Sequence, residues 1–160
     1  MNPRIAPLAD LYNLNTNLIN KTLKNLSDEV AHKRVNDTGS SLHWIIGHIA
    51  NSRHYVAGLF KAGTQFENSD LFNGGTPLKD PSDYPPIEEI KQIFESVTEN
   101  FIKRLSELTD EDINKKLDSK LPVDDDTMLA AISFFSLHES YHVGQLSYIR
   151  RQLGMDGLTG

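Results

Sequence analysis

Four long segments of the chain repeat apolar residues at steps of three and four, the spacing that gathers side chains on one face of an α-helix. The most regular of them has apolar residues at positions 87, 90, 94, 97, 101, 105 and 108. Four amphipathic helices bury their apolar faces most completely against one another. The sequence therefore predicts an all-α fold, a four-helix bundle, with helices over residues 7–26, 42–62, 87–108 and 128–153.

The segments between the predicted helices contain residues that favour turns. Residues 63–86 are rich in Gly, Pro, Asn and Asp and are too numerous for a tight turn, so we expect this long connection to cross the bundle from end to end. Residues 109–117 favour a short helical turn, and residues 120–126 favour a loop with some extended chain. Within that loop, residues 124–126 are three aspartates that lack the glycine and spacing of a calcium-binding loop, so they favour helix capping instead. A chain of 160 residues fits one domain, and we expect residues 1–160 to form a single bundle domain.

The composition is ordinary for a globular protein and excludes several classes of site. The formal net charge of −6 argues against a general nucleic-acid-binding surface. The chain has no cysteine, which excludes disulfides, cysteine-ligated zinc, iron–sulfur clusters and a cysteine nucleophile. The amino terminus lacks the apolar run of a signal peptide, and no stretch approaches the roughly 18 apolar residues of a membrane span. We therefore expect a cytoplasmic protein that binds neither nucleic acid nor membranes.

Two histidines, His138 and His142, are four residues apart in the predicted helix over residues 128–153. They lie one turn apart on the same face, which is the apolar face that also carries Phe135 and Leu146. Two inward imidazoles at this spacing can bind one metal ion. The alternative, a pair of histidines that pack in the core without a metal, would require several buried hydrogen-bond partners.

The other four histidines occupy less uniform positions. His48 falls on the apolar face of the predicted helix over residues 42–62, whereas His43 and His54 fall on the opposite face and are expected to meet solvent. His32 lies in a charged, loop-like segment. The periodicity thus separates three inward histidines from three outward ones, although it does not place His48 at the depth of the inward pair. Three protein ligands leave a fourth position open for water or substrate, as in catalytic metal sites.

Residues 138–142 read His-Glu-Ser-Tyr-His and match the H-E-x-x-H motif of zinc proteases, in which the glutamate is the general base. The match does not extend further, because such proteases take a third ligand from later in the chain and no histidine or glutamate follows His142. Glu139 is nevertheless the candidate catalytic residue, as a base on metal-bound water or as a partner that orients a ligand histidine. Alternatively, its carboxylate pairs with a lysine or arginine, or lies at the edge of the helix interface.

Two motifs resemble those of the DinB/YfiT-like metalloenzyme family. Residues 42–50, Leu-His-Trp-Ile-Ile-Gly-His-Ile-Ala, resemble its second-helix motif, a tryptophan followed four residues later by a histidine. Residues 138–146, His-Glu-Ser-Tyr-His-Val-Gly-Gln-Leu, resemble its fourth-helix motif, H-x-x-x-H followed by a glycine–glutamine pair. One departure is Val143, which stands where a basic residue often precedes the glycine. The resemblance covers essentially the whole chain.

The resemblance implies an up-down-down-up four-helix bundle, commonly a homodimer, that holds one divalent transition metal (Ni, Zn, Fe or Mn). By motif position, the implied ligands are His48, His138 and His142. The resemblance also implies a small-molecule substrate, because the best-understood relatives are thiol-dependent transferases or isomerases that use bacillithiol, mycothiol or glutathione. Since this chain has no cysteine, any thiol must be a low-molecular-weight cosubstrate. The expected function is therefore metal- and thiol-dependent S-transfer.

Two other functions stay open on the sequence. The first is metal-dependent hydrolysis of a small molecule, because a metal with an open position can lower the pKa of bound water. The second is a non-enzymatic helical binding module with a vestigial metal site. An enzyme should bind a metal at a position that a small ligand can reach, whereas a binding module should contain no metal.

Overall fold

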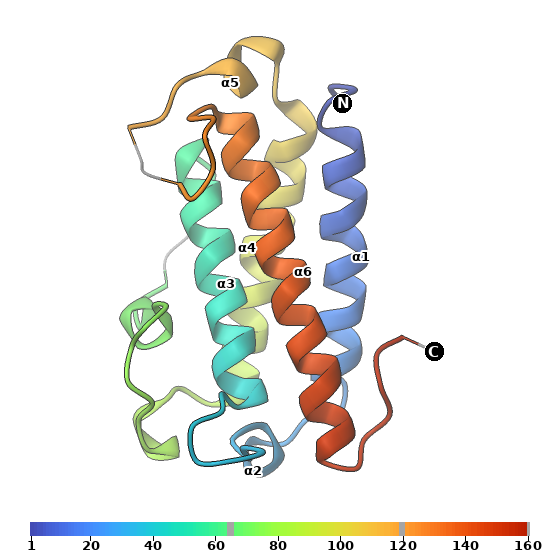
Figure 1. Ribbon diagram of the computed structural model, residues 1–160, viewed down its shortest axis with the longest axis vertical. Helices are drawn as coiled ribbons and strands as arrows, with labels where there is room; N and C mark the ends of the chain where they lie inside the picture. The colour runs from blue at the N-terminus through green and yellow to red at the C-terminus, as the bar shows by residue number, and fades with distance from the viewer. Residues whose placement is uncertain (64–65, 119–120, 160) are drawn as a thin grey trace.

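The computed structural model describes residues 1–63, 66–118 and 121–159, and four long α-helices dominate it (Figure 1). These are α1 (Ala6–Leu23), α3 (Leu42–Leu59), α4 (Ile87–Glu107) and α6 (Met128–Gln152). The short helices α2 (Asp28–Ala31) and α5 (Asp110–Asn114) lie at opposite ends of the bundle. The described residues form no β-strand, and their extended pairing is limited to an isolated bridge between Lys116 and Thr127. The predicted all-α fold is confirmed.

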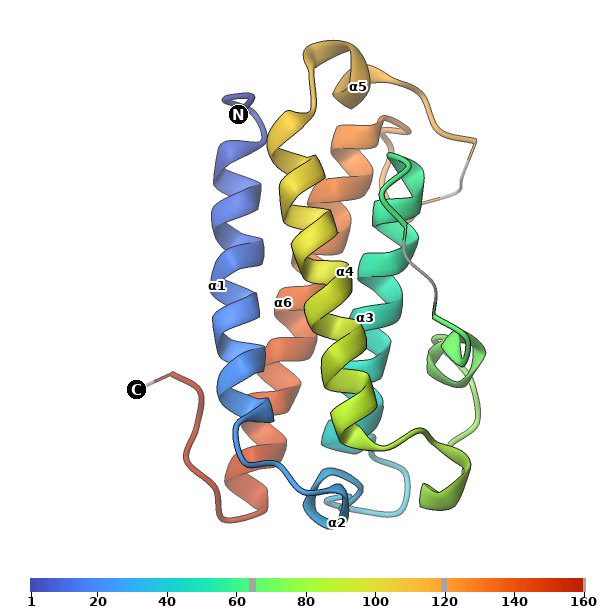
Figure 2. The same cartoon turned by 180° about the vertical axis from the view of Figure 1, so that it is seen from behind.

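Two consecutive long helices, α3 and α4, run in the same direction, which requires one long connection between them (Figures 1 and 2). Helices α1 and α6 run one way and α3 and α4 run the other (Figures 1 and 2). Both α1 and α3 pack against α4 and α6, so α1 and α3 are diagonal partners. The chain after α3 returns along the outside of this helix before α4 begins, through the short turns η1 (Ser69–Phe72) and η2 (Pro81–Asp83). The up-down-down-up order and the crossing connection are both confirmed.

Local signals set the starts of the two helices that carry the inward histidines. The hydroxyls of Ser41 and Thr127 accept hydrogen bonds from the backbone N–H groups of Trp44 and Ala130, respectively, and so cap α3 and α6. In the aspartate run before α6, the Asp125 carboxylate accepts from the Thr127 N–H at 2.9 Å. It therefore holds the capping residue Thr127 and does not cap the helix itself. The short turn expected over residues 109–117 is α5, whereas α2 was not predicted.

Two apolar clusters fill the interior. The cluster nearer the start of α3 includes Ile46, Ile49, Phe94 and Leu146, and the other includes Val56, Val97, Phe101 and Ile132. Between them along the helices lie the buried charged side chains of Arg53 and Glu139. Among the described residues, none of the helices combines the length and apolarity needed to cross a membrane. Lys120, the first residue of the predicted loop over residues 120–126, lies outside the described residues.

Candidate metal centre

The three histidines that were predicted to face inward lie close together. His48 comes from α3, and His138 and His142 come from neighbouring turns of α6. The Nε2 atom of His138 lies 3.2 Å from Nε2 of His48 and 3.1 Å from Nε2 of His142. His48 and His142 are buried, whereas His138 is partly exposed. The structure therefore places His48 at the same depth as the pair on α6, which periodicity could not do.

Hydrogen bonds on the far side of two rings set their tautomers. Nδ1 of His48 lies 2.7 Å from the backbone oxygen of Phe72, and because a carbonyl only accepts, Nδ1 carries the hydrogen. Nδ1 of His142 lies 2.7 Å from Oε1 of Gln145 and likewise donates. In the neutral rings, each Nε2 then presents a lone pair toward His138. Gln145 also donates to the Tyr141 hydroxyl, at 3.3 Å, which agrees with this orientation of its amide.

Burial keeps these imidazoles uncharged at neutral pH. Desolvation lowers the pKa of His48 and of His142 below the usual value of 6.5. The pKa of His138 falls to about 4, mainly through burial and then through the positive charge that His142 or His48 would carry when protonated. The neutral imidazole is the form that binds metals, so no proton has to leave at pH 7.

The residues present fit a divalent transition metal. A tetrahedral ion with metal–nitrogen bonds of 2.0–2.1 Å separates its ligand nitrogens by about 3.3 Å, close to the 3.1 and 3.2 Å found here. Without a cation, two fixed lone pairs, those of His48 and His142, face a third ring that can donate only one hydrogen from Nε2. Nδ1 of His138 is buried and has no partner among the described residues. Three neutral nitrogens suit Zn²⁺, Ni²⁺ and similar ions.

One face of α3 holds the crossing connection against this cluster. The indole N–H of Trp44 donates to the Leu71 carbonyl at 3.2 Å, and the amide of Asn51 donates to the Ser69 carbonyl at 3.2 Å. The Trp44 ring also stacks on the His48 ring, with centroids 4.9 Å apart and planes 8° apart. The chain at η1 is thus docked by side chains on both sides of His48 and by His48 itself.

Glycine at position 47 allows this docking. A Cβ there would overlap the Phe72 ring, so only glycine lets that ring lie against the α3 backbone. The same residue, Phe72, supplies the carbonyl that accepts from His48. The tryptophan and the glycine of the second-helix motif therefore have structural roles of their own. Trp44 stacks on the His48 ring, and Gly47 admits the Phe72 segment whose carbonyl orients that ring.

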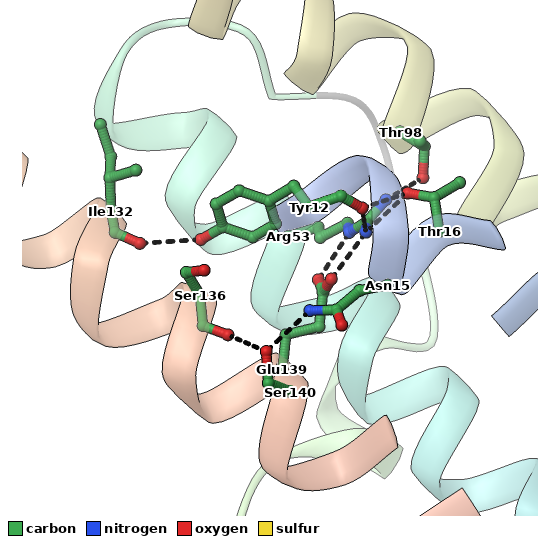
Figure 3. A network of polar contacts seen from close by, with 9 residues as sticks. All are labelled: Tyr12, Asn15, Thr16, Arg53, Thr98, Ile132, Ser136, Glu139 and Ser140. Carbon is green, nitrogen blue, oxygen red and sulfur yellow. Dashed lines mark hydrogen bonds and ion pairs between the residues drawn. The ribbon is translucent and has the colours of Figure 1, made fainter. Parts of the chain in front are cut away.

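Glu139 forms an ion pair that the sequence analysis left as an alternative. Both of its carboxylate oxygens accept from Arg53 at 2.7 Å, and the two side chains are 1% and 3% exposed (Figure 3). The guanidinium also donates to the hydroxyls of Thr98 on α4 and Thr16 on α1, at 2.6 and 2.9 Å. One side chain thus joins all four long helices. The catalytic role expected for Glu139 stays a prediction, which this full engagement of its oxygens does not favour.

The network around this pair extends along α1 and α6. The Tyr12 hydroxyl donates to the Ile132 carbonyl at 2.9 Å, and burial followed by the Glu139 charge raises the pKa of this tyrosine. Asn15 donates to the hydroxyl of Ser140 at 3.0 Å (Figure 3). These bonds fix the depth of α6, and hence of its histidines, against α1.

Sequence reasoning missed Arg53, although a signal existed. Within α3, Arg53 is the sole Lys, Arg, Asp or Glu residue, and within α6 Glu139 is the sole carboxylate. Two helices with so few charges bury each charged side chain only when it is paired. A lone cation and a lone anion on neighbouring apolar helices therefore predict each other.

The expectation that His43 meets solvent was wrong. Its side chain is 0% exposed, and Nε2 donates to the Pro85 carbonyl at 2.8 Å. The outer face of α3 is covered by the crossing connection, which periodicity within the helix cannot reveal. His54 is partly exposed. His32 follows α2 directly and its ring stacks on His43, with centroids 4.2 Å apart.

Comparison with known proteins gives one family and one fold. The family model described as the DinB superfamily matches residues 11–146. A solved structure, described as YfiT from Bacillus subtilis, "a probable metal-dependent hydrolase with an unusual four-helix bundle topology", superposes with a TM-score of 0.67 at 13% identity. The superposition covers 98% of this chain and 91% of that one, and at this identity it shows the fold. No curated protein sequence matches the chain.

Proposed function

This chain belongs to the DinB superfamily, and we propose that it is a metal-dependent enzyme whose ion is held by His48, His138 and His142. The observation that carries the proposal is the convergence of three Nε2 atoms, with adjacent separations of 3.2 and 3.1 Å. With three protein ligands and an open position, a divalent ion supplies Lewis-acid chemistry to water, a thiol or a substrate oxygen. Ni, Zn, Fe and Mn are the candidate ions.

The chain's own residues orient these ligands and exclude water from one side. The Phe72 carbonyl and Gln145 hold the Nδ1 hydrogens of His48 and His142, so the Nε2 lone pairs point inward. Trp44 covers one face of the His48 ring. Glu139 has no free carboxylate oxygen while it pairs with Arg53, so we do not assign it as the base.

We propose hydrolysis of a small molecule as the reaction, ahead of thiol-dependent transfer. The description of YfiT as a probable metal-dependent hydrolase supports this order. The described rings that contact the three histidines are neutral aromatics such as Trp44, Phe134 and Tyr141. S-transfer with glutathione or bacillithiol is the alternative reaction.

The expected assembly is a homodimer in which residues 1–160 of each chain form a single domain.

Elemental analysis of protein purified without a histidine tag tests the metal proposal. We expect a transition metal in the wild type, with about one equivalent missing in His138→Ala. His54→Ala, which alters a histidine of α3 outside the cluster, is the matched control and should retain the metal content of the wild type. A wild type without metal, which also takes up none at neutral pH, would contradict the metal proposal and favour the non-enzymatic binding module.

A substrate screen then separates the two reactions. Metal-loaded protein is assayed on small esters and amides with and without added glutathione or bacillithiol. Turnover that needs no thiol and disappears in His138→Ala supports hydrolysis. Turnover that depends strictly on the thiol favours the transferase. Light scattering after size exclusion decides whether the chain is a dimer.

A further inference from the structure

A second group of metal-binding side chains lies where α2, the start of α3 and the start of α4 meet (Figure 1). One ligand atom from each of Asp28, His32 and His43 lies within 4.8 Å of the others. Asp28 and His32 are four residues apart at α2, so they project from the same side of one turn. His43 comes from the first turn of α3. None of the three belongs to the histidine cluster described above.

His43 carries a nitrogen that the protein alone leaves without a partner. Its Nε2 donates to the Pro85 carbonyl at 2.8 Å, so in the neutral ring Nδ1 is the lone-pair nitrogen. The whole side chain is 0% exposed, and among the described residues Nδ1 has no hydrogen-bond partner. A buried acceptor left without a partner destabilises the folded state. A cation at Nδ1 would satisfy this atom.

The other two side chains lie close to His43. Oδ1 of Asp28 accepts from the Ile87 N–H at 2.8 Å, which anchors the carboxylate and leaves its second oxygen for another partner. His32 stacks on His43 with ring planes 21° apart, so the two rings lie face to face. His32 is only partly buried and follows the end of α2, so its ring can turn out of the stack toward a shared ion.

The surroundings admit a cation and a small additional ligand. A surface cavity of about 470 Å³ adjoins the cluster and is lined by Asp28, Glu29, His32, Pro81, Tyr84 and Pro86. Two of these residues are carboxylates and none is a lysine or arginine. The positive ends of the α3 and α4 dipoles oppose a cation here. Coordination by the three ligands is much stronger than this repulsion, so the ligands decide whether a cation binds.

We propose that Asp28, His32 and His43 form a second divalent-cation site, with two imidazole nitrogens and one carboxylate oxygen as protein ligands. His43 binds through Nδ1, and the position left open faces the cavity. A set of two nitrogens and one oxygen takes Zn²⁺, Ni²⁺ or Co²⁺ rather than Mg²⁺ or Ca²⁺, which prefer oxygen ligands. Burial lowers the pKa of both histidines, that of His43 to about 4, so both rings are neutral ligands at pH 7.

The proposal is tested by titrating zinc into chelator-stripped, tag-free protein in an isothermal titration calorimeter. The wild type should bind about two equivalents of Zn²⁺, and Asp28→Asn and His32→Ala should each bind about one. Asp28→Asn keeps an acceptor for the Ile87 N–H, and His32 is partly exposed, so neither change removes a core side chain. Glu29→Gln, which alters the neighbouring carboxylate of the cavity, is the matched control and should retain both equivalents.

Variants of the histidine cluster keep this test separate from the proposed enzyme site. His138→Ala should lose one equivalent and retain the one at Asp28, and Asp28→Asn/His138→Ala should bind none. A single equivalent in the wild type that Asp28→Asn and His32→Ala leave unchanged would overturn the second site alone. NMR of the His32 ring gives an independent readout, because zinc should shift its resonances in the wild type and in His138→Ala but not in Asp28→Asn.

Discussion

Arg53 and Glu139 form a bidentate ion pair, with both nitrogen–oxygen distances at 2.7 Å. Glu139 directly follows the metal-ligand candidate His138 in the sequence. The pair joins α3 to α6, the two helices that contribute the metal-binding histidines. Because both groups are almost completely buried, they can be satisfied only when the two helices adopt one relative depth. The ion pair therefore sets the register that brings His48 level with His138 and His142.

Glu139→Gln should destabilise the fold strongly. The change leaves the Arg53 charge buried without its anion, and breaking a buried pair from one side typically costs about 3–5 kcal/mol. The double variant Arg53→Met/Glu139→Leu should recover much of this loss, because it removes both charges. Urea unfolding followed by circular dichroism measures each value. A loss below about 1 kcal/mol for Glu139→Gln would show that the pair is not buried as described.

Gly47→Ala should weaken metal binding more than its small size suggests. The added methyl group would overlap the Phe72 ring and displace the carbonyl that accepts from His48. Loss of such an orienting bond typically lowers metal affinity by about 10- to 100-fold. Gly58→Ala is the matched control on the same helix, since a Cβ there meets nothing within 4 Å. Competition with a chromophoric chelator compares the variants, and equal affinities for both would contradict the role of Gly47.

Gln145→Leu should have a similar effect at the second oriented ring. The leucine cannot accept the hydrogen of His142 Nδ1, so the affinity should fall by about 10- to 100-fold with little change in the urea midpoint. Gln145→Glu keeps an accepting oxygen and should therefore bind the metal more tightly than Gln145→Leu does. The same chelator competition measures both. An unchanged affinity in Gln145→Leu would mean that His142 needs no partner to present Nε2.

The metal-free protein should lose stability as the pH falls from about 6.5 to 4. Burial, with a smaller contribution from His32, lowers the pKa of His43 from 6.5 to about 4. In this window the unfolded chain binds a proton that the folded chain does not, so the free energy of unfolding decreases with decreasing pH. The contribution of His43 is at most about 3 kcal/mol.

Urea unfolding of chelator-treated protein at several pH values measures this slope. His43→Gln removes one titrating ring and keeps a donor for the Pro85 carbonyl, so it should reduce the slope of the curve between pH 6.5 and 4. A residual slope should remain, because the pKa of His138 also falls to about 4. Parallel curves for His43→Gln and the wild type would show that His43 does not contribute to the acid sensitivity.

Much of the helical structure could be predicted from the sequence. The helix expected over residues 87–108 is α4, Ile87–Glu107, and the one expected over residues 128–153 is α6, Met128–Gln152. These predictions succeed because periodicity and capping involve residues within a turn or two of one another. The shared face of His138 and His142 follows from the same short-range geometry.

The error at His43 shows where that geometry ends. Residues 42–50 are buried on all sides of α3, so this part of the helix has no solvent face for a periodic pattern to identify. Ile46, which follows His43 by three residues and is therefore its neighbour on the helix surface, was the available warning that this side is covered. The segment that covers this side lies after α3 in the chain, and its path depends on where α4 packs.

Short-range patterns were thus enough to predict the four long helices and the pair of inward histidines on α6. Long-range packing was needed to bring His48 to that pair, to match Arg53 with Glu139, and to place His43 beside Asp28 and His32. The reason is physical: a helix constrains its own residues through bonds three and four positions apart. The depth of one helix against another depends on side chains many residues apart, and these are satisfied together only in the folded bundle.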